Sequence, residues 1–241
     1  MLKKILGRIL RIEDNLSPEY KDGVKKTSFS QCGEDVLVDY VFNLRGISKP
    51  SYIDIGAHHP YLLSNTALFY DRGCRGVNIE ANPALISEFL RYRPLDVNLN
   101  IGISDKEGEM DFYIMDDNTL STFSVQEHNF MVAEGKKLEK VQKIKLTTLD
   151  SVLKKYFADG FPDFMSIDVE GMDFQILQSI NFEESFPKII CVEAAEYSPI
   201  GAGARRNELI DFLISKNYFE YANTNLNAIM VKNEFWLASR L

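Results

Sequence analysis

Short runs of β-branched residues alternate with segments in which apolar residues recur every three or four positions. The first pattern is typical of buried strands and the second of amphipathic helices. Strands are expected at 52–55, 76–80, 96–101, 164–167 and 189–192. Helices are expected at 33–44, 64–72, from 83 onward, and at 148–157, 172–180 and 205–216. This alternation predicts an α/β fold with a doubly wound, mostly parallel sheet.

The two ends and the middle of the chain depart from this alternation. Two last strands, at 217–222 and 227–232, flank the turn-like NTNLN and are expected to form an antiparallel hairpin. The region 109–146 reads as an insertion or as extra strands beside the sheet, and 1–45 as a helical lead-in. All of 1–241 is expected to form a single domain, because this length suits one α/β core.

The composition is that of a globular protein and argues against binding to nucleic acid. Hydrophobic residues make up 45% and charged residues 26% of the chain, both ordinary values. The net charge is −8 and the pI about 5.0, and no dense Lys/Arg run offsets this acidity. Cys32, Cys74 and Cys191 lack CxxC spacing and are interpreted as buried free thiols in a reducing cytoplasm.

The first residues, MLKKILGRILRIEDN, have an apolar stripe at helical spacing. Arg8 and Arg11 interrupt this stretch, so we expect no signal peptide and no transmembrane segment here. The helix could pack on its own domain or on a homodimer partner, or it could lie on a membrane surface. A cytoplasmic location is expected.

The end of the first strand resembles a nucleotide-binding turn with too few glycines. Asp54, Gly56 and Ala57 are followed by His58, and Tyr61 stands at the third position of a GxGxxG pattern. A dinucleotide site needs those glycines for the pyrophosphate, so an NAD(P)-dependent oxidoreductase is the weaker alternative. A ligand that the protein backbone must approach closely at only one point, such as the amino-acid end of S-adenosylmethionine, fits this turn better.

The next two strand ends offer polar groups for the rest of such a cofactor. Glu80, near Asn82, stands roughly two dozen residues after the glycine turn, where an acidic side chain commonly binds ribose hydroxyls. It could equally be a solvated carboxylate. Ile103, Ser104 and Asp105 could border the adenine, although SDKEG is also a good turn.

Acidic residues follow the fourth and fifth strands. Asp168 and Glu170 alternate in FMSIDVEGMD, and Glu193 would lie about 5 Å from Asp168 on a neighbouring strand. Carboxylates this close need a shared proton or a cation, so a divalent metal, Mg²⁺ or Mn²⁺, is expected on Asp168 and Glu193. His58 or His59 could be a further ligand or a general base. Alternatively, Asp168 caps a turn, Glu193 is in a salt bridge and the histidines are structural.

The loop after the fifth strand offers groups for an acceptor substrate. Tyr197 and the SPIGAGARRNE segment precede a helix that begins near Arg205 and Arg206. Arginines at a helix N-terminus suit a phosphate group, such as the diphosphate of a nucleotide sugar. Exposed arginines on a helix are also commonly just solvated.

Taken together, these motifs resemble the FkbM family of S-adenosylmethionine-dependent methyltransferases. The resemblance runs from Phe29 to Pro199 and is closest to members found with bacterial surface-polysaccharide genes. It rests on FSQCGEDVLVDYVF, YIDIGAHHP, GVNIEANP, LNIGISDKEG, LTTLDSVL and DFMSIDVEGMDFQIL. It implies a Rossmann-like class I methyltransferase fold, with a sugar or nucleotide-sugar hydroxyl as the methyl acceptor.

The resemblance also implies roles for single residues. Asp54, Gly56 and Glu80 would hold the cofactor, and Gln31 and Glu34 of SQCGED would close over its methionine end. Glu170 or a histidine would take the hydroxyl proton.

One departure concerns the metal. Metal-dependent relatives such as catechol O-methyltransferase follow the strand-five acid with an Asp or Asn ligand, where this chain has Ala194, so Glu196 or a histidine would have to substitute. A non-catalytic S-adenosylmethionine-binding partner subunit is the remaining alternative.

Overall fold

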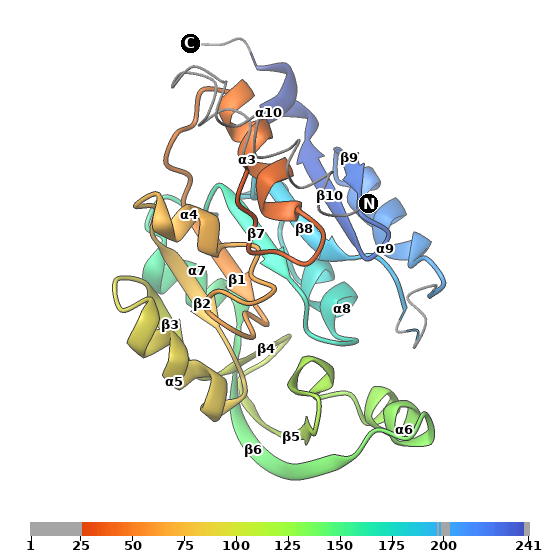
Figure 1. The fold of residues 1–241 in the computed structure, drawn as a ribbon. Coiled ribbons are helices and arrows are strands. Elements are labelled where there is room, and N and C mark those ends of the chain that lie inside the picture. The colour runs from red at the N-terminus through yellow and green to blue at the C-terminus, as the bar shows by residue number, and fades with distance from the viewer. Residues whose placement is uncertain (1–25, 197, 199–202, 239–241) are drawn as a thin grey trace, which may run out of the picture.

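A seven-stranded sheet forms the centre of the computed structural model, which describes residues 26–196, 198 and 203–238 (Figure 1). The strand order is β3-β2-β1-β7-β8-β10-β9. The strands are β1 (Tyr52–Ile55), β2 (Gly76–Ile79), β3 (Val97–Leu99), β7 (Phe164–Ile167), β8 (Ile189–Glu193), β9 (Tyr218–Asn223) and β10 (Asn227–Lys232). The predicted helix near the N-terminus and Tyr197 lie outside the described residues.

The first five strands of this order are parallel, and β10 is antiparallel to both β8 and β9. The predicted mostly parallel sheet with a C-terminal antiparallel hairpin is therefore confirmed. The hairpin adds its second strand next to β8, so β9 becomes the edge strand.

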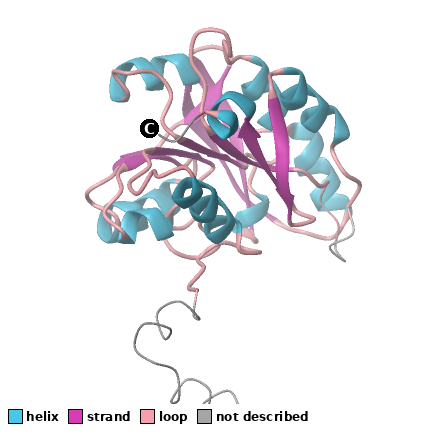
Figure 2. Ribbon diagram, turned by 90° about the horizontal axis from the view of Figure 1, so that it is seen from above, coloured by secondary structure: helices cyan, strands magenta, loops and turns pink. Residues whose placement is uncertain are grey.

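Helices cover both faces of this sheet (Figure 2). On one face, Ile53, Ile55 and Met165 pack into a core shared with α7, α8 and α9. On the other, Tyr52 and Phe164 pack with α3 and α4. Successive residues of one strand thus enter different cores, which explains why the buried strands are apolar throughout. The helices around this sheet are α3 (Glu34–Leu44), α4 (Ala67–Asp71), α5 (Pro83–Tyr92), α7 (Leu149–Tyr156), α8 (Asp173–Gln178), α9 (Asn207–Ser215) and α10 (Asn233–Leu237).

The middle of the chain forms a second, three-stranded sheet of order β4-β6-β5. It contains β4 (Gly102–Ser104), β5 (Gly108–Met115), the 3₁₀ turn η1 (Asn118–Leu120), α6 (Val125–Ala133) and β6 (Leu138–Thr148). Strand β6 pairs in parallel with β4 and antiparallel with β5. Figure 1 shows this sheet below the carboxyl ends of the main strands.

The expected strand at 96–101 is wrong at its end, because β3 stops at Leu99. The Asn100 side chain donates hydrogen bonds to the carbonyls of Glu80 and Ala81, both at 2.9 Å. These bonds turn the chain out of the main sheet, so residues 102–104 join the second sheet instead. None of the helices within the described ranges has the length and apolar character needed to cross a bilayer.

Candidate active site

A cavity of about 460 Å³ lies at the carboxyl ends of the main parallel strands. This is the size and the place expected of a cofactor site in an open α/β sheet. Among the residues singled out from the sequence, those that line it are Gln31, Asp54, Gly56, Ala57, His58, Glu80, Ile103, Asp168, Glu170, Glu193 and Glu196. Residues at four separate strand ends of the main sheet thus line one cavity.

The β1 end supplies the floor of the cavity. Gly56 has a φ of 80°, and both it and Ala57 donate backbone hydrogen bonds of 3.0 Å to the Ile79 carbonyl. Asp54 is 3% exposed and its Oδ2 accepts a hydrogen bond of 2.6 Å from the Thr66 hydroxyl. The turn therefore presents a recessed carboxylate beside a tightly tied backbone.

Glu80 is held by the backbone of two neighbouring loops. Its carboxylate accepts hydrogen bonds from the amides of His58 (2.8 Å) and Asn82 (2.6 Å). Burial raises the pKa of Glu80 to about 7, although these two bonds favour the ionised form. Asn82 caps α5 by accepting from the Ala84 amide and donates to Asn118 in η1. Asn82 thus links the β2 loop to η1 and does not line the cavity, so its contact with a cofactor stays a prediction.

Three further predicted cofactor residues do not line the cavity. Glu34 is fully buried and accepts hydrogen bonds from the side chains of Thr224 (2.8 Å) and Asn227 (2.9 Å). Asn227 itself lines the cavity, so Glu34 supports that wall from behind. Ser104 donates to Asp105 at 3.0 Å, and neither side chain lines the cavity. Because β4 turns into the second sheet, only Ile103 of that trio faces the site.

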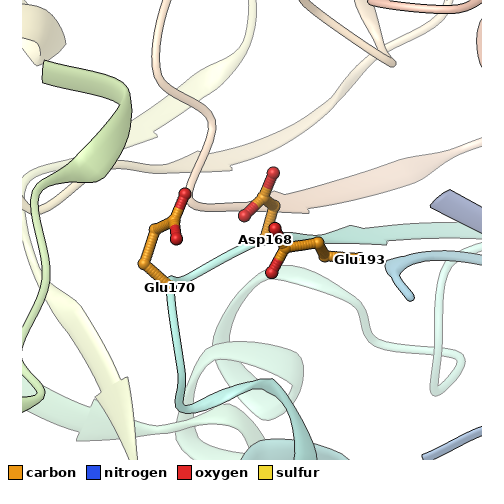
Figure 3. Close-up of side chains that lie close together, drawn as sticks. All are labelled: Asp168, Glu170 and Glu193. Atoms are coloured by element: carbon orange, nitrogen blue, oxygen red, sulfur yellow. The ribbon is translucent and has the colours of Figure 1, made fainter. Parts of the chain in front are cut away.

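Three carboxylates converge at one side of the cavity (Figure 3). Asp168, Glu170 and Glu193 each offer an oxygen within 4.8 Å of the other two. Glu170 has a φ of 51°, a left-handed conformation that is rare for a residue with a side chain and that clusters at functional sites. Its carbonyl accepts a 2.7 Å hydrogen bond from Thr122, a buried residue of the loop before α6. The second sheet therefore helps to hold Glu170.

The carboxyl groups of this cluster resist ionisation. Enclosure by protein atoms raises the pKa of Asp168 to about 7 and that of Glu193 to about 9, and neighbouring carboxylates add to both shifts. The pKa of Glu170 is raised well above its usual range for the same two reasons. Asp168 is nevertheless exposed and lines the cavity. The cluster is thus an acidic centre that a cation would stabilise.

Arg206 supplies part of that positive charge. Its guanidinium lies 2.9 Å from Glu193 and 3.4 Å from Asp173, the first residue of α8. Arg205 points elsewhere and pairs with Glu220 at 2.7 Å. The two arginines line a neighbouring cavity, not the one at the strand ends, and both already have carboxylate partners. The two arginines are therefore not arranged to bind one diphosphate together.

The two histidines have different environments. His58 lines the cavity, burial lowers its pKa, and its Nδ1 receives no well-formed hydrogen bond from the described residues. His59 does not line the cavity. Its Nδ1 accepts from the amides of Tyr61 (3.1 Å) and Leu62 (2.9 Å), so the proton of the neutral ring is on Nε2. This ring closes a turn through Nδ1, and the expectation that His59 is a ligand or base stays a prediction.

Sequence reasoning missed several residues that shape the site. Thr66 and Thr122 act through tertiary hydrogen bonds, and Asn65 and Asn227 line the cavity. Thr66 and Asn65 belong to the SNTALFY segment that follows the glycine turn, which was a usable signal. Thr122 lies in the middle region, where no motif pointed to the site.

Comparison with solved structures gives matches of low identity to methyltransferases. A protein from Staphylococcus aureus, provisionally assigned as a caffeoyl-CoA O-methyltransferase, is 13% identical, with 97% of this chain and 100% of that chain covered, and has a TM-score of 0.44. The 1,6-didemethyltoxoflavin-N1-methyltransferase of Burkholderia thailandensis is 9% identical (93% and 87% covered; TM-score 0.41). An O-methyltransferase from Bacillus cereus is 13% identical (94% and 90% covered; TM-score 0.40).

Comparison with families gives a direct assignment. No curated protein matches the sequence. The family model of the methyltransferase FkbM domain matches residues 54–221, which include the strand ends and the carboxylate cluster. Because this match spans most of the sequence, the chain belongs to the FkbM family of S-adenosylmethionine-dependent methyltransferases.

Proposed function

We propose that this chain methylates a hydroxyl of a sugar or nucleotide sugar used in bacterial surface polysaccharide synthesis, with the help of a divalent metal. The observation that carries the proposal is the carboxylate cluster on the wall of the cofactor cavity. A hydroxyl needs an activating group before it can attack a methyl donor, and this cluster can supply a metal ion and a base.

The cavity residues fit S-adenosylmethionine. Two backbone amides occupy part of the Glu80 carboxylate, which has about four acceptor positions in all, so ribose hydroxyls can still bind. Asp54 offers a negative charge for a cationic ligand. The donor supplies an electrophilic methyl group on sulfur. A dinucleotide oxidoreductase is disfavoured, because His58 and Tyr61 stand where pyrophosphate binding needs glycine.

Asp168 and Glu193 are the proposed metal ligands. Hard carboxylate oxygens suit Mg²⁺ or Mn²⁺, and the mutual repulsion of the cluster would be relieved by a dication. A metal bound there would lower the pKa of a coordinated hydroxyl. Glu170 is the proposed base, because a dication bound to the cluster would favour the ionised form of this carboxyl, which can accept a proton. As the acceptor oxygen bonds to the methyl carbon, the carbon–sulfur bond breaks and the hydroxyl proton passes to Glu170.

Isothermal titration of Mn²⁺, Mg²⁺ and S-adenosylmethionine into metal-stripped protein tests this proposal. Asp168→Ala should abolish metal uptake, whereas Glu170→Gln should keep it and lose turnover with nucleotide-sugar acceptors. Asp150→Asn, on the exposed side of α7, is the matched control. Loss of metal binding in Glu170→Gln would make Glu170 a ligand instead of the base.

A second reading of the chemistry has one observation in its favour. The buried Nδ1 of His58 and the lowered pKa of this ring make a neutral imidazole that can accept a proton. Cofactor binding without metal uptake, together with loss of turnover in His58→Ala, would favour this reading. If Asp168→Ala, Glu170→Ala and Glu193→Ala all kept biological activity, the chain would be a non-catalytic partner subunit.

A further inference from the structure

Arg93, at the C-terminal end of α5, is completely buried. Arginine is almost never fully buried unless it is paired, so its partners indicate why it is there. It lies 2.9 Å from Asp96 in an ion pair and donates to Tyr52 Oη (2.9 Å) and Asn78 Oδ1 (3.0 Å). A further nitrogen, Nη1, donates to Thr66 Oγ1 at 3.0 Å.

The bond to Thr66 leads to the cavity. Thr66 is fully buried, does not line the cavity, and lies behind Asp54, which does. A guanidinium can only donate, so Thr66 Oγ1 must accept from Arg93. The single hydroxyl proton is then left for Asp54 Oδ2, which it reaches at 2.6 Å. The direction of both hydrogen bonds is thereby fixed, from Arg93 through Thr66 to Asp54.

The charges of this group do not cancel. The positive charge of Arg93 is matched by Asp96, with which it is in direct contact, and Asp54 adds a second carboxylate at the cavity floor. Burial raises the pKa of Asp54, whereas the Thr66 hydroxyl and the charge of Arg93 favour its ionised form. An ionised Asp54 therefore leaves one uncompensated negative charge facing the cavity, which suits a positively charged ligand group.

We propose that Thr66 and Arg93 are positioning residues. They hold the Asp54 carboxylate toward the cavity, where it binds the positively charged methionine end of S-adenosylmethionine. This inference rests on the cofactor placement of the proposed function. It assigns a function to two residues that never touch the cofactor. It also gives a reason for the presence of an arginine in the core. Apolar residues of similar volume often stabilise a protein as much as a buried ion pair does, so stability alone does not require Arg93.

Calorimetric titration of S-adenosylmethionine into the full chain, with thermal unfolding of each variant, tests the inference. Thr66→Val keeps the shape of the side chain and removes the hydroxyl, so binding should weaken about ten- to hundredfold, as is typical for a lost hydrogen bond to a charged group. Thr66→Ser keeps the hydroxyl and should bind within about threefold of the unmodified protein. At saturating cofactor, kcat of Thr66→Val should change little, because Asp54 does not touch the reacting atoms.

Tyr52→Phe is the matched control, since it removes a buried hydroxyl that bonds Arg93 and Asp96 rather than Thr66 or Asp54. It should lower the melting temperature and leave cofactor affinity unchanged. Equal loss of affinity in Tyr52→Phe and Thr66→Val, in step with their stabilities, would overturn the inference, as would unchanged affinity in Thr66→Val.

Asp54→Asn separates this inference from the function on which it rests. If Asp54→Asn and Thr66→Val both weaken binding, the positioning role is supported. Normal binding in Asp54→Asn would show that Asp54 does not hold the cofactor, which removes the purpose of Thr66 while leaving the methyltransferase assignment in place. Absence of any cofactor binding by the unmodified protein would instead contradict the proposed function itself.

Discussion

The backbone of Gly56 lies directly against the carbonyl of Asp168: a Cβ atom on residue 56 would come within 1.7 Å of that oxygen. The amide of Asp168 also donates to the Ile55 carbonyl at 3.0 Å. The end of β1, which borders the cofactor cavity, and the end of β7, which begins the carboxylate cluster, are therefore held together without side chains. This contact, and not only an approach to a ligand, requires glycine at this position.

Gly56→Ala should separate these two strand ends. The new methyl group meets backbone rather than a flexible side chain, so we expect a large loss of turnover, about a hundredfold or more, and several kcal/mol of destabilisation. Gly46→Ala is the control, because Gly46 also has a positive φ (77°) but nothing lies within 4 Å of its Cβ position. It should cost only about 1 kcal/mol, as measured by denaturant unfolding. Similar turnover in both variants would contradict this account.

Thr122→Val should disturb Glu170 from the side of the second sheet. The variant loses the 2.7 Å bond to the Glu170 carbonyl and the acceptor for the Ser124 amide. We expect kcat to fall about tenfold, with cofactor affinity unchanged, and stability to fall by about 1–2 kcal/mol. Thr148→Val, which removes the N-cap of α7, should cost a similar stability without changing kcat. A drop in kcat shared by both variants would indicate a general loss of fold.

Arg206→Met should leave the carboxylate cluster without its internal cation. Because Arg206 is only 20% exposed and pairs with Glu193 and Asp173, its loss should lower the metal-free unfolding free energy by about 2 kcal/mol. Saturating Mn²⁺ should restore more stability to this variant than to the unmodified protein. Arg205→Met breaks a more exposed pair and should cost less than about 1 kcal/mol. Equal losses in the two variants would be unexpected.

Glu80 should make the stability of the protein depend on pH. The pKa of Glu80 is about 7 in the folded state, against a reference value of 4.5 for the unfolded chain. Between pH 4.5 and 7, Glu80 is therefore protonated to a greater extent in the folded than in the unfolded protein. The stabilisation is fully present below about pH 4.5 and is lost as pH rises through about 7, an effect on the order of 3 kcal/mol. Glu80→Gln should remove this slope, seen as the difference from unmodified protein in denaturant unfolding. The exposed Glu109→Gln is the control, and a slope unchanged in Glu80→Gln would refute the assignment.

Much of the main sheet could be predicted, because its strands carry the information locally. The strands at 52–55 and 164–167 form as expected, since buried parallel strands are short continuous apolar runs. The end of β3 could not be predicted, because it depends on Asn100 bonding to carbonyls of the β2 loop. Nothing near Asn100 in the sequence indicates that contact.

The candidate site also has parts that the sequence predicts and parts that it does not. Asp168 and Glu193 could be placed together from strand ends alone, since neighbouring parallel strands bring their carboxyl ends to one edge. The role of Arg93 could not, because an arginine in a helix pattern is normally exposed and its partners Tyr52, Thr66 and Asn78 lie 15 or more residues away along the chain. For His59, only the structure shows that the ring nitrogen closes a turn, a structural role that the sequence left open.

The second sheet pairs only with itself: β4, β5 and β6 form hydrogen-bonded ladders with one another and none with the main sheet. It contributes Asn118, Leu120 and Phe123 to the cavity wall from a stretch between two of its own strands. Apart from Thr122, which holds Glu170, that stretch can change in composition without breaking any ladder of the main sheet. Substitutions in this stretch could therefore change the shape of the cavity wall during evolution, while the residues at the ends of the main strands stay the same.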